Sequence, residues 1–241
     1  FMSCSARLPI YVLFSSMFFG KYAMLACYSM YLLGIVIAIL TAYIISKIDG
    51  SKAEHALLIE LPEYKAPNAR TIAVYVWEKV KDYLTKAGTV IFFASIVMWL
   101  LLNVGPSGFV TDITESFGAV IGKAIVPFFK PLGLGYWQIV VALISGIAAK
   151  EVVVSSCSVL FGIQNITTSH GMDSFVAALG AMGFGAANAY ALMVFCLLYV
   201  PCTATIATIH REVGSTKVTA GIVLFQLAVA WVVSFIAFHV A

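Results

Sequence analysis

Charged residues are scarce in this sequence of 241 residues. Only 10% of the residues are Asp, Glu, Lys or Arg, whereas 62% are hydrophobic, and the mean hydropathy is +1.01. These values lie outside the range of soluble globular proteins and predict an all-α polytopic integral membrane protein. The lipid bilayer is therefore the first expected partner. Because the net charge is only +3, nucleic-acid binding has no support.

Catalytic and disulfide signatures are missing as well. The sequence contains no HExxH, GxSxG, GxGxxG or GxxxxGK[ST] pattern, so this chain is expected to bind no nucleotide, to carry no cofactor and not to be an enzyme. All five cysteines lie in or beside apolar runs, which argues against a disulfide framework. The first residues do not form a signal peptide, and we expect the chain to begin inside a helix of a longer or processed protein.

Long apolar runs define the organisation. Residues 1–46 hold two runs that meet at Gly20-Lys21. One helix through both would be about 60 Å long, far more than a bilayer core needs, so two helices with a turn at Gly20 are expected. Residues 47–86 carry seven Lys and Arg residues. The positive-inside rule predicts that this loop is cytoplasmic.

The spacing of Ile72, Val76, Val80 and Leu84 predicts an amphipathic helix within the loop 47–86. Two arrangements are open: the helix lies flat on the inner membrane surface, or it packs beneath its own bundle. Three further segments follow. They are a membrane span with an outer connector (87–135), a segment with the most unusual charges (136–211) and a final span (212–241). Loop charges leave open whether residues 136–161 cross the membrane or dip in and return.

Lys150 and Glu151 stand side by side inside an apolar run. Ionisable groups at membrane depth are costly and usually serve a transport pathway. Adjacent residues on a helix point about 100° apart, so these two charges are not expected to pair. Gly146 permits a helix break, which would expose backbone carbonyls to a substrate. In the structural alternative, Lys150 extends to an interface and Glu151 accepts hydrogen bonds at a helix start.

Two cysteine segments complement this stretch. Cys4 follows Ser3 and precedes Arg7, and we expect Arg7 to pair with Glu151 across the bundle. Cys202 follows Pro201, whose missing amide frees a carbonyl near the thiol. Each cysteine opens a similar triplet, Cys-Ser-Ala at 4–6 and Cys-Thr-Ala at 202–204, as expected for an internal-repeat transporter. The other three cysteines are expected to pack as small apolar residues, and they are Cys27, Cys157 and Cys196.

Four stretches together resemble the C-terminal half of the ferrous iron transport protein B (FeoB) family, in the family's order and across nearly the whole chain. They are FMSCSARLP (1–9), ELPEY (60–64), AKEVVV (149–154) and LYVPCTATI (198–206). The resemblance implies a helical bundle with broken or re-entrant gate helices. It implies that residues 1–46 contain the end of a first Gate segment and that residues 136–211 form the second.

The resemblance also implies a function and partners. These are Fe²⁺ uptake across the bacterial inner membrane by a multi-pass transporter, with an N-terminal GTPase domain and a first membrane half that this chain lacks. GTP and Mg²⁺ would bind only that GTPase domain. Small cytosolic Feo proteins are expected partners, and a homo-oligomer is left open.

Our hypothesis for the site follows from the chemistry of Fe²⁺, which accepts thiolate, carboxylate and carbonyl ligands and must be released again. Cys4 and Cys202 would offer sulfur, and Glu151 a carboxylate. Lys150 would be structural and hold an acidic or carbonyl partner. Two other functions are open: a carrier of small organic solutes of the nucleoside type, and a membrane scaffold without a transport path.

Overall fold

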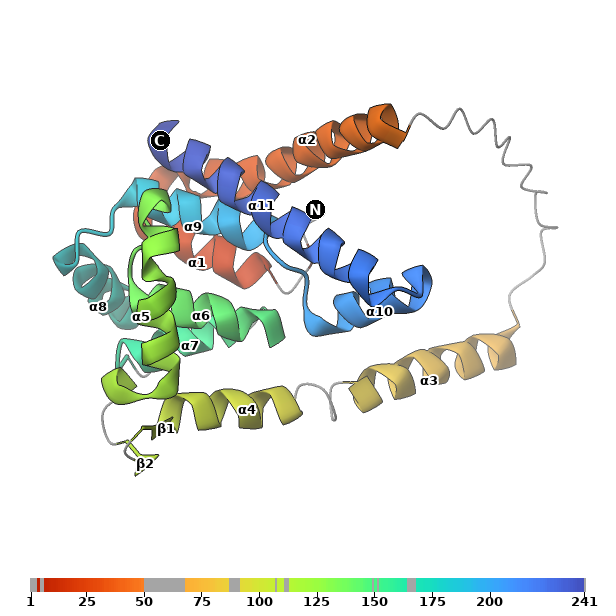
Figure 1. Ribbon diagram of the computed structural model, residues 1–241, viewed down its shortest axis with the longest axis horizontal. Coiled ribbons are helices and arrows are strands. Elements are labelled where there is room, and N and C mark those ends of the chain that lie inside the picture. Colours follow the sequence, from red (N-terminus) through yellow and green to blue (C-terminus); the bar gives the residue numbers. More distant parts are fainter. Residues whose placement is uncertain are drawn as a thin grey trace.

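The computed structural model describes residue 4 and residues 7–49, 68–86, 92–106, 108–110, 113–148, 150, 152–163 and 168–240. These residues form helices joined by turns, with one two-stranded hairpin, which confirms the predicted all-α fold (Figure 1). The α-helices are α1 (Leu8–Phe19), α2 (Ala23–Asp49), α3 (Ala69–Lys86), α4 (Phe92–Asn103), α5 (Phe117–Phe129), α6 (Trp137–Ala148), α7 (Val152–Leu160), α8 (Ser169–Ala181), α9 (Ala186–Leu198), α10 (Thr203–Val213) and α11 (Thr216–Val240). The antiparallel hairpin pairs β1 (Val104–Gly105) with β2 (Gly108–Phe109).

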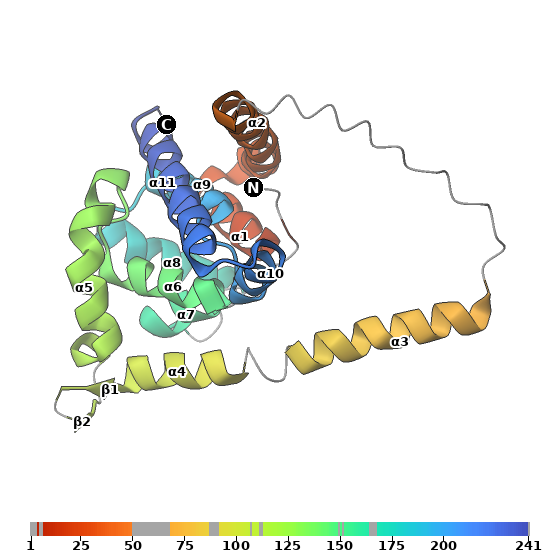
Figure 2. The ribbon, with the colours of Figure 1, turned by 45° about the vertical axis from the view of Figure 1, so that its right-hand side comes forward.

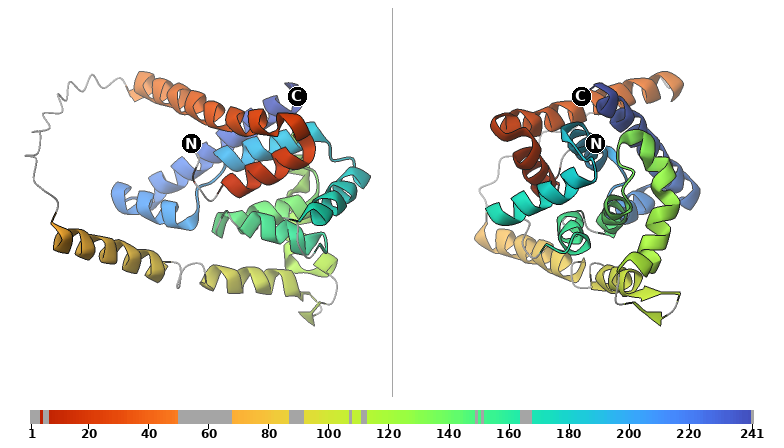
Figure 3. Two further views of the ribbon diagram at one scale, coloured as in Figure 1. Left: turned by 180° about the vertical axis from the view of Figure 1, so that it is seen from behind. Right: turned by 90° about the vertical axis from the view of Figure 1, so that its left-hand side faces the viewer.

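The first apolar stretch turns back at Gly20, as its length predicts. Gly20 has a φ of +46°, a conformation that favours glycine, and it opens a short 3-10 turn over Gly20–Tyr22. The hydroxyl of Ser15 on α1 lies 3.5 Å from the thiol of Cys27 on α2, and the two helices pack together. Figure 3 shows α1 and α2 meeting at this turn.

Helix α9 forms the centre of the molecule. Every residue from Ala191 to Val200 is buried, and α9 packs against α11, α1 and α2. Two polar contacts fix these neighbours. The hydroxyl of Ser234 on α11 donates to the carbonyl of Ala191 at 2.8 Å, and Ser29 on α2 bonds to the hydroxyl of Tyr190 at 3.1 Å. A helix that is apolar on all sides is therefore covered on several sides at once.

Two pairs of helices are sharply bent. The stretches Phe117–Leu132 and Trp137–Ile147 meet at 101°, and His170–Ala181 and Ala186–Leu198 meet at 106°. Helix α5 lies in the range expected to be an outer connector. Two further stretches are long and apolar enough to cross a membrane: Leu8–Lys47, which contains α1 and α2, and Thr216–Val240. Together with the bent pairs they agree with a polytopic fold that contains broken helices.

Helices α6 and α7 form a tight antiparallel pair, which addresses whether this segment crosses or returns. The hydroxyl of Ser145 lies 2.8 Å from the hydroxyl of Ser156, although these residues are eleven positions apart in the chain. The chain therefore folds back around Lys150, and α6–α7 is a hairpin instead of one continuous crossing.

Helix α3 is amphipathic, as its spacing predicts, and its described side chains are exposed. The exposed apolar residues include Val76, Trp77 and Val80. Figure 2 shows this helix clear of the bundle formed by the other helices. Of the two arrangements considered, packing beneath the bundle does not occur among the described residues.

Candidate functional site

Two interruptions of helical structure, the turn between α6 and α7 and the stretch between α9 and α10, lie inside the bundle near the start of α1. Helix α1 packs against both α7 and α9. Lys150, in the α6–α7 turn, lies within electrostatic range of Arg7 and of three thiols, those of Cys4, Cys196 and Cys202. In Figure 1 the ends of α1, α6 and α9 lie toward the middle of the molecule. The structure thus brings together four residues that the sequence analysis selected from distant parts of the chain: Cys4, Arg7, Lys150 and Cys202.

Lys150 has an aromatic neighbour where an acidic or carbonyl partner was expected. Its Nζ lies 4.3 Å from the centroid of the Tyr199 ring. Only 4% of Lys150 is exposed, so its side chain does not extend to the surface of the described structure. Neither Lys150 Nζ nor the Tyr199 hydroxyl has a hydrogen-bond partner in the part of the chain that the structure describes. A cation over an aromatic face is a recognised form of stabilisation.

Other aromatic side chains hold the ring of Tyr199 in position. It stacks on Phe195, one helical turn earlier, with the centroids 5.5 Å apart and an interplanar angle of 28°. Phe195 in turn contacts Phe129 of α5 edge-on at 5.1 Å. Tyr199 is only 3% exposed. The aromatic face that receives Lys150 is therefore part of the packed core.

Gly146 lies in the last turn of α6, on the side that packs against α7. Helix α6 continues through Gly146 to Ala148, and α7 begins at Val152. A Cβ atom on Gly146 would collide with Val153 and with the Tyr199 hydroxyl. The glycine is needed for close packing because it leaves room for the ring beneath Lys150.

Pro201 and Cys202 occupy the stretch between α9 and α10. Helix α9 ends at Leu198, and the buried Pro201 precedes Cys202, the N-cap residue of α10. The Cys202 thiol lies 3.3 Å from the hydroxyl of Thr205, and the Cys202 carbonyl accepts the amides of Thr205 and Ile206. The half-buried thiol thus lies at the start of a helix.

The remaining predicted residues lie at the chain start or outside the described residues. Cys4 is exposed, and its carbonyl accepts the amide of Arg7 at 3.1 Å. Arg7 is buried, with 7% exposed. Ser3 and Glu151 lie outside the described residues, and so does the expected pairing of Arg7 with Glu151. Among the described residues, no group of three or more His, Cys, Asp or Glu side chains could hold a metal ion.

Two residues of this cluster were not expected from the sequence. Tyr199 belongs to the stretch LYVPCTATI (198–206) but had no expected role of its own, and Cys196 was expected to pack as an apolar residue. Cys196 is fully buried, as expected, but it also lies within electrostatic range of Lys150 and Arg7. The available signal was spacing, because Cys196 and Tyr199 lie three residues apart at the end of a helix that stops before Pro201.

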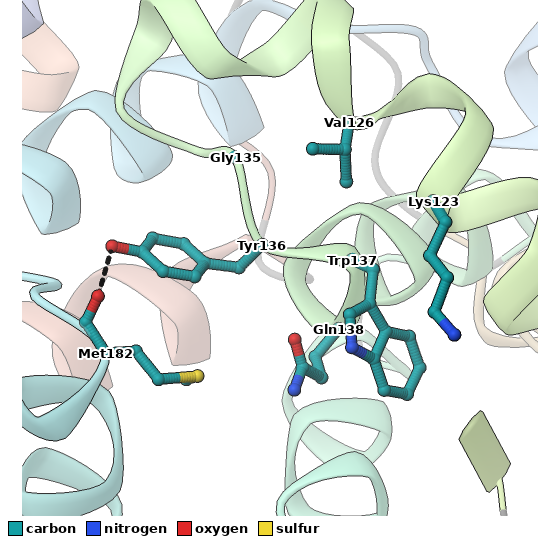
Figure 4. Close-up of a pocket in the computed structure, with 7 residues that line it drawn as sticks. All are labelled: Lys123, Val126, Gly135, Tyr136, Trp137, Gln138 and Met182. Carbon is teal, nitrogen blue, oxygen red and sulfur yellow. Dashed lines mark hydrogen bonds between the residues drawn. The ribbon is translucent and has the colours of Figure 1, made fainter.

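A separate pocket lies where the two bent pairs touch. It has a volume of about 300 Å³ and is lined by Lys123, Tyr136, Met182 and four other residues (Figure 4). The Tyr136 hydroxyl donates to the carbonyl of Met182 at 2.8 Å, and Lys123 Nζ lies 5.8 Å from the centroid of the Trp137 ring. No residue of the Lys150 cluster lines this pocket.

Comparison with known families agrees with the sequence resemblance. Residues 84–216 match the family model Gate, described as nucleoside recognition, and residues 27–79 match the C terminus of ferrous iron transport protein B. The α6–α7 hairpin and the α9–α10 stretch both fall within the Gate match.

Named relatives cover the whole chain. The Fe(2+) transporter FeoB of Staphylococcus aureus (strain MSSA476) is 40% identical over 245 residues, which is 100% of this chain and 35% of that protein. FeoB of Methanocaldococcus jannaschii is 40% identical over 243 residues, covering 98% of this chain and 35% of that protein. A protein of Porphyromonas gingivalis named as a fusion of Fe(2+) transport protein A with FeoB is 32% identical over 286 residues, covering 99% of this chain and 33% of that protein.

The chain spans about a third of the length of these relatives. No solved structure matches it. The Gate match covers more than half of the sequence, and the named relatives are membrane transporters whose C-terminal part is the part that aligns. The chain therefore belongs to the Gate family of membrane domains and corresponds to the C-terminal membrane part of ferrous iron transport protein B.

Proposed function

We propose that this chain forms part of the Fe²⁺ pathway of a multi-pass transporter in the bacterial inner membrane. The observation that carries the proposal is the meeting of the α6–α7 turn, the α9–α10 stretch and the start of α1 around Lys150, with the thiols of Cys4, Cys196 and Cys202 in electrostatic range. Interrupted helices at membrane depth give an ion access to backbone carbonyls. Thiols add ligands suited to a borderline ion such as Fe²⁺.

The proposed ligands are Cys4, Cys202 and Glu151. The two thiols would bind the ion during passage, and the Glu151 carboxylate would compensate its charge or bind it transiently. Binding that is too tight would prevent release, so a site with few ligands suits conduction. Ser3, Arg7 and Pro201 would support the geometry around these ligands.

The proposal also assigns separate functions to different parts of the complete protein. This chain would carry no enzymatic activity, and GTP with Mg²⁺ would bind a GTPase domain elsewhere in the polypeptide. A small cytosolic Feo protein would be a partner, because one relative is named as a fusion of Fe(2+) transport protein A with FeoB.

Serine substitutions test the ligand assignment. Cys4→Ser and Cys202→Ser, singly and together, are introduced into the complete transporter, and ⁵⁵Fe²⁺ uptake is measured in an iron-starved host that lacks its own transporter. We expect each single variant to lower uptake and the double variant to lower it at least about tenfold. The matched control is Cys27→Ser, because Cys27 contacts Ser15 within the α1–α2 hairpin and lies outside the cluster. Normal uptake by the double variant, at normal protein abundance, would rule out the two thiols as ligands.

A nucleoside-type carrier is the second candidate, because the Gate model is described as nucleoside recognition. It predicts uptake of a radiolabelled nucleoside that is insensitive to loss of both thiols, with no Fe²⁺ uptake above background. The same variants and host distinguish the two functions when both substrates are measured side by side.

A further inference from the structure

The candidate pathway already holds a cation of the protein itself. Lys150 is 4% exposed, and its Nζ lies over the Tyr199 ring among the groups expected to receive Fe²⁺. An ammonium group at such depth is normally paired with a carboxylate or bonded to carbonyls. Among the described residues, Lys150 Nζ has no hydrogen-bond partner. The aromatic face is thus its main observed stabilisation.

The same surroundings would suit a metal cation. The face of Tyr199 attracts positive charge, and the thiols of Cys196 and Cys202 lie within electrostatic range of Lys150. A divalent ion and the ammonium group repel each other strongly in a buried environment, so they do not occupy this place together. Arg7, also buried nearby, adds to the repulsion.

We propose that Lys150 on Tyr199 is a latch that closes the pathway to divalent cations, and that Fe²⁺ passes only when Lys150 leaves the Tyr199 ring. This inference rests on the proposed function, because it assumes that the cluster lies on the ion path. It assigns Lys150 the role of a resident cation and Tyr199 the role of its receptor.

The surrounding packing explains how such a latch is held. The hydrogen bond between Ser145 and Ser156 keeps α6 and α7 together behind the turn that carries Lys150. Gly146 lets the Tyr199 hydroxyl approach α6 closely, and Phe195 fixes the orientation of the ring. Lys150 and Tyr199 lie on two different interruptions, the α6–α7 turn and the α9–α10 stretch. A shift of either interruption separates them, which is how motion elsewhere would open the latch.

The test uses the complete transporter reconstituted in vesicles that contain a fluorescent divalent-cation chelator, with no nucleotide present. Lys150→Met removes the charge and keeps the length, and Tyr199→Leu removes the aromatic face. We expect either variant to raise the nucleotide-free influx of Fe²⁺ at least about tenfold over the parent protein. Lys150→Arg and Tyr199→Phe keep the charge and the ring, so their influx is expected to stay within about twofold of the parent.

Lys123→Met is the matched control. Lys123 also lies near an aromatic ring, Trp137, but at 5.8 Å and at the separate pocket, so its influx is expected to equal that of the parent. A gain of influx is informative because a merely structural residue loses function when it is replaced. If Lys150→Met does not fold, Tyr199→Leu decides, since it leaves the charge in place. Unchanged or reduced influx in a correctly folded variant would overturn the latch.

The outcome is separable from that of the proposed function, because Co²⁺ and Mn²⁺ influx are recorded in the same vesicles. Divalent-cation influx through Lys150→Met, with no Fe²⁺ uptake by the parent under any condition, would uphold the latch and reject the substrate. If the parent takes up Fe²⁺ but Lys150→Met shows no increase in nucleotide-free influx, the substrate is upheld and the latch is rejected.

Discussion

Gly146 shows how one missing side chain organises the site. It lies on α6 against Val153 and the hydroxyl of Tyr199, and no space is left there for a methyl group. The Tyr199 ring, stacked on Phe195, lies beneath the Lys150 ammonium. Small residues at such contacts let helices and rings approach closely inside membrane proteins.

Gly146→Ala is therefore expected to destabilise the folded protein. The added methyl group forces Tyr199 or Val153 to move, and overpacking of this kind costs about 1–3 kcal/mol. Thermal unfolding of the purified protein in detergent measures the effect. The matched control is Gly180→Ala in α8, where a Cβ atom meets nothing within 4 Å. This control is expected to be neutral or slightly stabilising because alanine favours a helix. Equal melting temperatures for both variants would contradict the close packing.

At the scale of helices, the two bent pairs are joined at their corners. The amide of Asn188 on α9 donates to the carbonyl of Gly133, just before α6, at 2.6 Å. Its side-chain oxygen accepts the amide of Gly185 at 3.0 Å, at the start of α9. Gly133 has a φ of +71° and closes the turn after α5. One side chain thus satisfies backbone groups that two helix ends leave without intrahelical partners.

Replacing Asn188 with Ala is expected to loosen this joint. Both hydrogen bonds are lost, and the loss of each costs about 1 kcal/mol, so the protein should melt at a lower temperature. Limited proteolysis near residues 182–185 should also become faster. Asn103→Ala is the comparison, because the Asn103 amide bonds to Trp99 within its own helix at 2.9 Å. A drop for Asn188→Ala no larger than that for Asn103→Ala would contradict a role in joining the pairs.

At the scale of the whole molecule, elements with different expected sides of the membrane lie at opposite ends. Figure 1 shows α3 and α10 toward one end and the β1–β2 hairpin toward the other. Helix α3 belongs to the basic segment, and α10 ends with His210 and Arg211. The positive-inside rule predicts that this end faces the cytoplasm. Helices α2, α4 and α11 then lead to or from the cytoplasmic end.

Cysteine labelling tests this orientation. We expect Lys79→Cys and Glu212→Cys to react with a membrane-impermeant maleimide only after cells are permeabilised, and Thr114→Cys to react in cells with an intact inner membrane. The three positions are exposed in the structure, and Cys4→Ser with Cys202→Ser provides the background. Labelling of Lys79→Cys and Thr114→Cys from the same side would contradict a crossing by α4.

Composition and apolar runs alone determined that the chain is helical and lies in a membrane, because scarce charge and long hydrophobic segments leave few other ways to satisfy the backbone. The turn at Gly20 followed from helix length, and the amphipathic helix followed from the spacing of its apolar residues. The sequence also selected Arg7, Lys150 and Cys202, since polar residues stand out against an apolar background.

Tertiary structure decided which of these residues meet. Spacing along one helix cannot reveal that Lys150 lies over Tyr199, 49 positions later, or that Gly146 makes room for that ring. The α6–α7 hairpin, too, depends on the contact between Ser145 and Ser156 and not on any loop charge. Periodicity reports one face of one helix, whereas a buried cation finds its partner through packing between helices, and that packing is fixed only when the whole bundle forms.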